Sequence, residues 1–128
     1  MKTILVADDD ENIVAGLTHR LQANRYRVIT AFDGAEALKL ALTQKPDLLL
    51  LDVWMPTGLG LSVVQRLEKL GRDIPVIFLT ASRLPKLRRA AENVGAAAYF
   101  EKPYDPEVLM QAIEAILDLN ASTPGHRT

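Results

Sequence analysis

The chain alternates between short apolar runs of four to six residues and longer segments in which apolar side chains recur every three or four positions. Runs of the first kind are typical of strands, and the longer spacing is typical of amphipathic helices. The runs that predict strands are Thr3–Ala7, Tyr26–Thr30, Leu48–Leu51, Ile74–Leu79 and Ala97–Phe100. A helical pattern follows each of them, so the chain predicts five strands and five helices in strict alternation.

The five helical segments each carry one apolar face. Their apolar positions are Ile13, Val14, Leu17 and Leu21; Ala35, Leu38, Ala41 and Leu42; Val63, Val64, Leu67 and Leu70; Leu84, Leu87, Ala90, Ala91 and Val94; and Leu109, Ala112, Ile113, Ile116 and Leu117. We expect the Asp33-Gly34 turn to cap the second helix. Gly71 and Gly95 are expected to end the third and fourth, because glycine readily takes the left-handed conformation after a helix.

Alternating strands and helices predict βαβ crossovers, and hence an α/β fold with a doubly wound, five-stranded parallel sheet. The most apolar runs are continuous rather than alternating, as expected for strands that are buried on both faces. We therefore expect Ile4–Ala7, Leu48–Leu51 and Ile74–Leu79 at the centre of the sheet. Tyr26–Thr30 is more polar and is predicted at an edge.

Composition narrows the class of protein. The 128 residues suit one domain, expected over 1–120, with 121–128 as a flexible tail or the start of a linker. The net charge of −1 does not favour direct nucleic-acid binding. Cysteine is absent, which excludes disulfides and Cys-type zinc sites and suits a cytoplasmic protein. No apolar run approaches the roughly 20 residues of a membrane span, and none resembles an export signal.

Polar side chains follow four of the predicted strands, at the edge where ligands bind in such sheets. They are Asp8 to Glu11 after the first strand, Asp52 after the third, Thr80 to Ser82 after the fourth, and Lys102 after the fifth. Crowded carboxylates repel each other unless a cation is present. Oxygen ligands favour Mg²⁺, which often binds beside a phosphate. Lys102 and Thr80 can then bind phosphate oxygens, and the phosphate is either a ligand or is transferred to a carboxylate.

At these positions the chain resembles the receiver domain of two-component response regulators. The matching segments, in the family's order and spacing, are Ile4–Asp10, Leu51–Pro56 with Gly60 following, Leu79–Ala81, Gly95–Ala96 and Lys102–Pro103. Each motif alone is weak, but the set together is specific, and it covers about residues 2 to 119. The resemblance implies a flavodoxin-like strand order of 2-1-3-4-5. It also implies a signalling switch rather than an enzyme.

The resemblance also implies roles for the acidic residues. Asp52 looks like the phosphoacceptor, which takes a phosphoryl group from a sensor histidine kinase or a phosphotransfer protein. Asp9 and Asp52 resemble ligands of Mg²⁺, together with the backbone carbonyl of Trp54. Asp8 looks like the residue that holds the metal through a water molecule. We expect Asp10 and Glu11 instead to stabilise the start of the first helix.

The remaining family positions concern switching and the lifetime of the phosphoryl group. Thr80 and Lys102 match the switch hydroxyl and the phosphate-binding lysine. Tyr99 falls at the aromatic switch position, although an aromatic residue on a short strand also packs for structural reasons. Trp54 and Ser82 stand at the positions that tune dephosphorylation. The Lys102-Pro103 bond resembles one that is cis in the family.

The chain departs from the family pattern in places, and other functions compete. Leu59 stands where the family often has Asp, Ala97-Ala98 replaces a frequently acidic pair, and Trp54 is unusually bulky. An aspartyl-phosphate phosphatase needs a second Asp at the place of Trp54, and a flavin module needs a phosphate-binding loop where Asp8 begins an acidic run. A degenerate receiver that acts only as a protein-interaction module is the third alternative.

A partner surface is predicted from charge. The fourth helix carries the basic residues Lys86, Arg88 and Arg89, and the fifth strand and helix carry the acidic residues Glu101, Asp105, Glu107 and Glu114. Opposite charges on adjacent elements can pair across a two-fold axis. We therefore hypothesise a homodimer, or kinase docking, through the face formed by the fourth helix, fifth strand and fifth helix.

Overall fold

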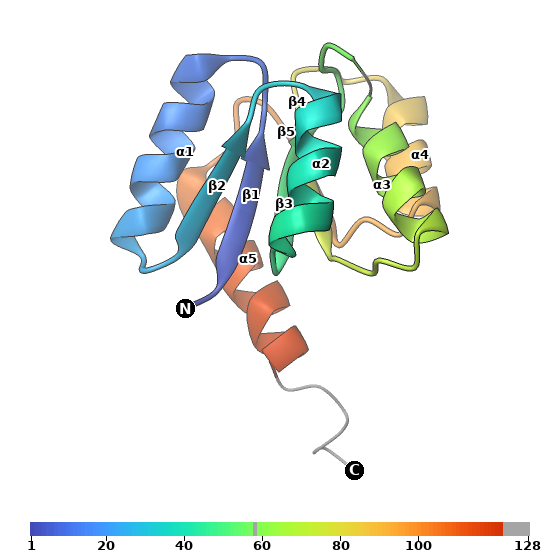
Figure 1. Ribbon diagram of the computed structural model, residues 1–128. Helices are drawn as coiled ribbons and strands as arrows, with labels where there is room; N and C mark the ends of the chain where they lie inside the picture. The colour runs from blue at the N-terminus through green and yellow to red at the C-terminus, as the bar shows by residue number, and fades with distance from the viewer. Residues whose placement is uncertain (58, 122–128) are drawn as a thin grey trace.

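The structure is a computed structural model that describes residues 1–57 and 59–121, and strands and helices alternate along it (Figure 1). In chain order the elements are β1 Thr3–Ala7, α1 Glu11–Ala23, β2 Arg27–Ala31, α2 Gly34–Gln44, β3 Leu48–Asp52, α3 Gly60–Lys69, β4 Val76–Thr80, α4 Pro85–Asn93, β5 Ala98–Glu101 and α5 Pro106–Ala121. The predicted five strands and five helices are confirmed. The predicted tail lies outside the described residues, apart from Ala121.

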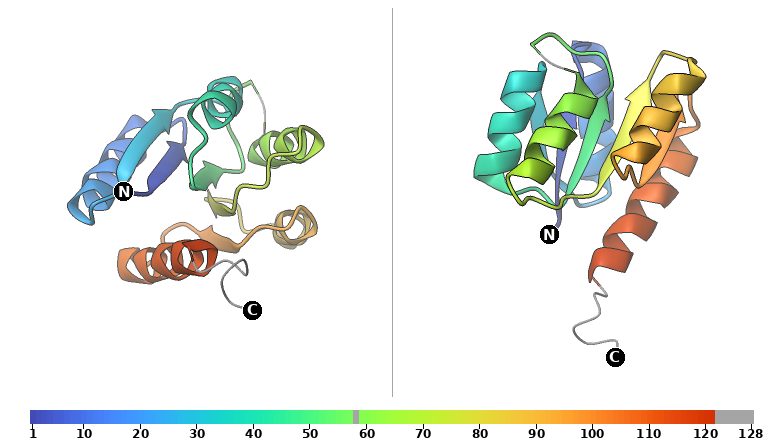
Figure 2. Two further views of the ribbon diagram at one scale, coloured as in Figure 1. Left: turned by 60° about the horizontal axis from the view of Figure 1, so that its bottom comes forward. Right: turned by 90° about the vertical axis from the view of Figure 1, so that its right-hand side faces the viewer.

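The five strands form one parallel sheet in the order β2-β1-β3-β4-β5, which confirms the predicted topology. β3 and β4 are buried along their whole length, whereas β2 is partly exposed at one edge. Helices α1 and α5 cover one face of the sheet, and α2, α3 and α4 cover the other (Figure 2). The most apolar strands therefore occupy the centre, as expected for a sheet buried on both faces.

Alternation along each strand divides the apolar side chains between two cores. Leu49 and Leu51 of β3 pack with α2, α3 and α4, whereas Leu48 and Leu50 pack with α1 and α5. Successive side chains of a strand point to opposite faces, so one continuous apolar run supplies both cores. This packing holds the carboxyl ends of the strands at a common edge.

The structure departs from the sequence prediction mainly where elements end. Leu70 and Leu84 fit the helical spacing, yet they lie just outside their helices and are 54% and 49% exposed. Ala35 is also exposed, because Gly34 and Ala37 supply the buried positions at the start of α2. Periodicity predicts the apolar face of a helix, but it does not predict the residue at which the helix ends.

The predicted caps are present. Asp33 is the N-cap of α2, and its side chain accepts a hydrogen bond from the backbone N–H of Glu36. Asp10 caps α1 in the same way, which supports its predicted structural role. Gly71 and Gly95 follow α3 and α4 with φ of 75° and 79°, where a side chain would strain the backbone.

Among the described residues, no helix combines the length and apolar character that a membrane span requires.

Candidate functional site

The predicted site residues lie at the carboxyl edge of the sheet. Asp8 follows β1, Asp52 ends β3, Thr80 ends β4 and Lys102 follows β5. β3 is the central strand and pairs with both β1 and β4, so Asp52 lies between the residues that end those two strands. The strand order thus brings together residues that are up to 94 positions apart in the sequence.

Lys102 joins the two buried carboxylates. Its Nζ donates to Asp8 Oδ2 at 2.7 Å and to Asp52 Oδ2 at 3.3 Å. The side chains of Lys102, Asp8 and Asp52 are only 17%, 4% and 11% exposed. Buried charges of this kind are stable only when they are paired. The ammonium group therefore neutralises part of the charge of the acidic cluster.

Burial and pairing act in opposite directions on these groups. Burial raises the pKa of Asp52, and the charge of Asp8 adds to that effect, while Lys102 and the backbone N–H of Trp54 oppose it. Burial by itself lowers the pKa of Lys102, but its hydrogen bond to Asp8 and the nearby carboxylates outweigh burial and raise it. The net effect raises the pKa of both groups, so Lys102 stays protonated at neutral pH and the surroundings of Asp52 favour added positive charge.

Three carboxylates are close enough to share a cation. Asp8, Asp9 and Asp52 each offer an oxygen atom, and these atoms all lie within 4.8 Å of one another. Asp9 is exposed, whereas the other two are buried, so the cluster is open to solvent on one side. A donor set made only of carboxylate oxygens fits a hard divalent cation such as Mg²⁺. The three carboxylates could therefore hold a metal ion, while the predicted roles of the Trp54 carbonyl and of a water molecule at Asp8 stay predictions.

Thr80 and Ser82 lie beside this cluster on the strand that neighbours β3. Thr80 is fully buried, and its Oγ1 accepts a hydrogen bond from the backbone N–H of Ser82 at 3.2 Å. The backbone N–H of Lys102 in turn donates to the carbonyl of Thr80 at 2.7 Å. The backbone of Thr80, not its hydroxyl, is therefore joined to the segment that carries Lys102.

Tyr99 is partly buried, and Trp54 is exposed. The Tyr99 hydroxyl is buried without a hydrogen-bond partner among the described residues, and Arg88 of α4 lies 4.7 Å from the centre of its ring. Trp54 is 49% exposed, and its backbone N–H donates to Asp52 Oδ1 at 3.2 Å. Asp52 thus has a donor on each oxygen, Trp54 on one and Lys102 on the other.

Comparison with known proteins agrees with this geometry. The family model described as the response regulator receiver domain matches residues 4–114. The chain belongs to this family. The receiver domain is 41% identical over 116 residues to the alkaline phosphatase synthesis transcriptional regulatory protein PhoP of Bacillus subtilis, covering 91% of this chain and 48% of that protein. It is 38% identical over 120 residues to the transcriptional regulatory protein PrrA of Mycobacterium tuberculosis, covering 94% of this chain and 52% of that protein. It therefore spans about half the length of these curated relatives.

Solved structures show the same fold. The receiver domain of the Francisella response regulator 1452 superposes with a TM-score of 0.87 at 30% identity, covering 92% of this chain and 98% of that one. A CheY-like receiver domain protein from Methanospirillum hungatei gives a TM-score of 0.87 at 29% identity, covering 92% and 94%. The chain is thus a receiver domain of the response regulators in both sequence and fold.

Three features of the site in this receiver domain depend on contacts between residues that are distant in the sequence. The ion pair between Asp8 and Lys102, and the stacking of Arg88 on Tyr99, depend on how distant strands and helices meet. The third is the close approach of Gly60 to the backbone of Asp52, where an added Cβ would lie 2.3 Å from the carbonyl oxygen. Only the glycine has a sequence signal, its place in the family motif.

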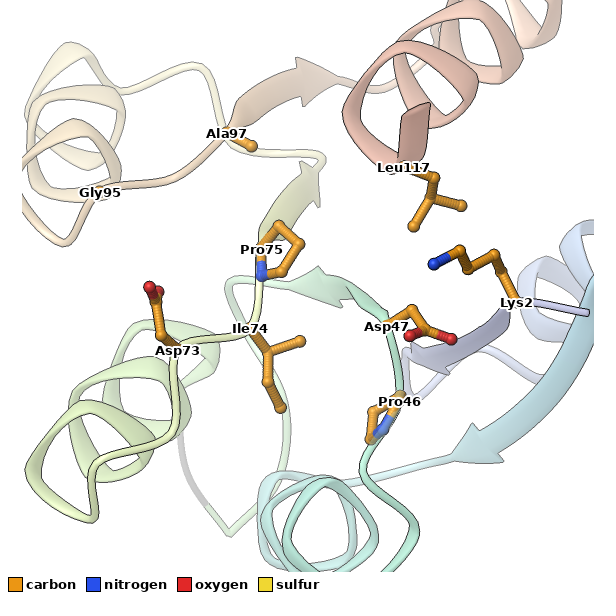
Figure 3. A pocket seen from close by; sticks show the side chains of 9 residues that line it. All are labelled: Lys2, Pro46, Asp47, Asp73, Ile74, Pro75, Gly95, Ala97 and Leu117. Carbon is orange, nitrogen blue, oxygen red and sulfur yellow. The ribbon is translucent and has the colours of Figure 1, made fainter. Parts of the chain in front are cut away.

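A cavity of about 550 Å³ lies at the edge of the sheet where the strands begin, opposite the edge where the acidic cluster follows them. Figure 3 shows the side chains that line it. Its lining comes from the segments that precede β1, β3, β4 and β5, and from Leu117 of α5. Asp47 in this lining already accepts a hydrogen bond from the backbone N–H of Thr3 at 2.8 Å. None of the site residues described above lines the cavity, so it is separate from the site around Asp52.

Proposed function

We propose that this receiver domain accepts a phosphoryl group onto Asp52 from a sensor histidine kinase or a phosphotransfer protein, in a reaction that requires Mg²⁺. The observation that carries the proposal is the position of Asp52: its carboxylate lies 3.3 Å from Lys102 Nζ and within 4.8 Å of oxygen atoms of Asp8 and Asp9. A nucleophile, a fixed positive charge and ligands for a cation therefore meet at one point.

The chemistry follows from that arrangement. An oxygen of the Asp52 carboxylate forms a bond to phosphorus, the N–P bond of the donor's phosphohistidine breaks, and the electron pair returns to the imidazole ring. Mg²⁺, held by Asp9, Asp52 and the carbonyl of Trp54, and through water by Asp8, would supply positive charge against the phosphoryl oxygens. Lys102, whose Nζ donates to Asp52 Oδ2, adds a second positive charge.

Transfer adds negative charge to a site that is already acidic, and this change drives the switch. The new phosphoryl oxygens compete with Asp8 for Lys102, and the Thr80 hydroxyl becomes a donor to them. Because Thr80 and Lys102 are joined through their backbones, movement of one displaces the segment that leads to Tyr99. Because the phosphoryl group interacts differently with two conformations of the domain, it shifts the equilibrium between them.

Particular residues argue against two alternative functions, an aspartyl-phosphate phosphatase and a degenerate receiver. A phosphatase of the aspartyl-phosphate type requires an acid–base carboxylate two residues after the nucleophile, and Trp54 stands there. A degenerate receiver would not keep Asp8, Asp9, Asp52 and Lys102 together around one point. The acceptor function is therefore the one that the geometry supports best.

The test is to add acetyl phosphate and Mg²⁺ and to weigh the intact protein. We expect a gain of one phosphate in the parent, none in Asp52→Asn, and slower labelling in Asp9→Ala because a metal ligand is lost. Asp10→Asn is the control, since Asp10 caps α1 and should label as the parent does. Full labelling of Asp52→Asn would refute the assignment.

We further propose that the face formed by α4, β5 and α5 is the output surface. Glu107 of α5 lies 3.8 Å from Arg20 of α1, so it pairs on the side of α5 away from α4. The α4 side of the proposed face exposes Lys86, Arg88 and Arg89, and Asp105 is exposed between β5 and α5. A two-fold axis would pair these charges with a second copy. Light scattering with and without beryllofluoride tests for a dimer, and charge reversal at Arg88 and Arg89 tests kinase transfer. A monomer in both states, with unchanged transfer, rules the surface out.

The setting of the whole protein is part of the proposal. The relatives are named transcriptional regulators and are about twice as long as this chain. We propose that the receiver domain works in the cytoplasm and regulates an activity that resides outside the receiver domain. The receiver domain itself makes no direct contact with nucleic acid or with a membrane. A DNA-binding measurement on this chain, with and without phosphorylation, tests that division, since binding by the receiver alone would contradict it.

A further inference from the structure

The loop between β3 and α3 is held against the start of α2 by hydrogen bonds around Thr57. The Thr57 hydroxyl accepts from the backbone N–H of Ala35 at 2.9 Å and donates to Asp33 Oδ1 at 3.1 Å. One residue earlier, the carbonyl of Pro56 accepts from the backbone N–H of Gly34 at 2.9 Å. The first two N–H groups of α2, which no helix can satisfy internally, are thus both satisfied by this loop.

Thr57 has an unfavourable backbone conformation for its residue type. Its φ is 63°, and among the described residues other than glycine only Arg25 and Lys45 also have positive φ. Thr57 is the β-branched member of the three, and a β-branched residue in this region is a genuine outlier. Such conformations persist where surrounding contacts hold them. The hydroxyl contacts to Asp33 and Ala35 are interactions that glycine, the easier residue at this φ, would not provide.

The same loop carries Trp54. It leaves β3 at Asp52, whose Oδ1 accepts from the backbone N–H of Trp54 at 3.2 Å. Met55 is then buried, and Thr57 joins the far end of the segment to α2. The segment from Asp52 to Thr57 is therefore fixed at both ends, with Trp54 between them. Loss of the Thr57 hydroxyl would remove the two side-chain hydrogen bonds that tie this end of the segment to α2, and would leave the bond from Gly34 to the carbonyl of Pro56 as its remaining hydrogen bond to that helix.

We propose that Thr57 is a positioning residue of the phosphoacceptor site. Its hydroxyl ties the loop to α2 and so holds Trp54 in place beside Asp52. Thr57 touches neither Asp52 nor the acidic cluster in the contacts described above, so it acts through Trp54. The part of the inference that concerns Mg²⁺ rests on the proposed function, while the part that concerns the place of Trp54 does not.

The experiment compares Thr57→Val with Thr57→Ser. Valine keeps the β-branched shape and removes the hydroxyl, whereas serine keeps the hydroxyl. Trp54 is the only tryptophan, so quenching of its fluorescence by acrylamide in metal-free protein reports its surroundings. A Mg²⁺ titration of the same samples reports the affinity of the metal site. Thr43→Val is the matched control, because the Thr43 hydroxyl also bonds on α2, to the carbonyl of Lys39 at 2.9 Å.

We expect Thr57→Val to change the quenching and to weaken Mg²⁺ binding by about three- to tenfold, the change that loss of one or two hydrogen bonds gives. Thr57→Ser and Thr43→Val should behave as the parent does. Thr57→Val with parental quenching and parental Mg²⁺ affinity would overturn the inference. A parent that binds no Mg²⁺ would instead refute the proposed function, and the quenching would still decide the role of Thr57.

Thr57→Gly covers the case in which the valine variant fails to fold. Glycine relieves the positive φ, so this variant should melt no lower than the parent. It still lacks the hydroxyl, and we therefore expect the same loss of Mg²⁺ affinity and the same change in quenching. If Thr57 only stabilised the fold, Mg²⁺ affinity would fall only in variants that also melt at a lower temperature. Parental Mg²⁺ affinity in Thr57→Gly would overturn the inference.

Discussion

Gly60 lies where the start of α3 passes against the backbone of Asp52. A Cβ added at this position would lie 2.3 Å from the carbonyl oxygen of Asp52 and 3.2 Å from a ring carbon of Phe78. The helix cannot simply move away, because the backbone N–H of Gly60 donates to the carbonyl of Val53 at 2.8 Å. Gly60→Ala must therefore displace either α3 or the end of β3.

The size of the effect follows from this close approach. Overpacking of a well-packed site costs typically 1–3 kcal/mol, and because the atom in the way belongs to the backbone we expect about 3 kcal/mol for Gly60→Ala. In a domain of this size each kcal/mol corresponds to roughly 4 °C in Tm, so the variant should melt about 12 °C below the parent. Because Asp52 itself is displaced, labelling by acetyl phosphate should also slow at temperatures where the variant is folded.

Gly16 provides the matched control. It lies within α1, and an added Cβ would meet no atom within 4 Å. Alanine is favoured over glycine in a helix by about 0.5–1 kcal/mol, so Gly16→Ala should melt about 2–4 °C above the parent and label normally. Thermal unfolding followed by circular dichroism measures both variants. If Gly60→Ala melts within 3 °C of the parent, the close approach does not constrain the fold as argued.

Two further predictions concern the residues around Asp52. Phosphorylated Trp54→Asn should lose its phosphate roughly tenfold faster than the parent, equivalent to a barrier lowered by about 1.4 kcal/mol, because the indole no longer excludes water. Phosphate release at saturating Mg²⁺ measures this, and a variant no faster than the parent would show that the indole is not the gate. Lys102→Met should lower the free energy of unfolding at neutral pH by about 3 kcal/mol, since Asp8 and Asp52 would be buried without their cation. Burial alone would lower the pKa of Lys102, but pairing with Asp8 and Asp52 raises it above its ordinary value of 10.5. The stabilisation by Lys102 is therefore complete below pH 10.5 and is lost as pH rises through the folded-state pKa. In urea denaturation, the difference between the parent and Lys102→Met should shrink above pH 10.5, and a difference that stays constant there would contradict the pairing.

The sequence predicted the fold because its local signals agree with one another. Continuous apolar runs such as Leu48–Leu51 required burial on both faces, and helical spacing between the runs required crossovers. These two patterns leave few arrangements other than a parallel sheet covered by helices. The candidate site followed from the same reasoning, because strands that run in parallel end at a common edge. Asp52 and Lys102 were therefore predicted to meet although they are 50 residues apart.

Interactions between elements were decided only by the tertiary structure. Nothing in the local sequence distinguishes Asp8 as the closer partner of Lys102, because that choice depends on the relative positions of β1, β3 and β5. Thr57 appears in the sequence as an ordinary loop residue, and its bonds to α2 arise only when two βα units pack side by side. Periodicity and strand ends are properties of neighbouring residues and can be read along the chain. Contacts between side chains on different elements depend on packing distances of an ångström or less, which no local pattern specifies.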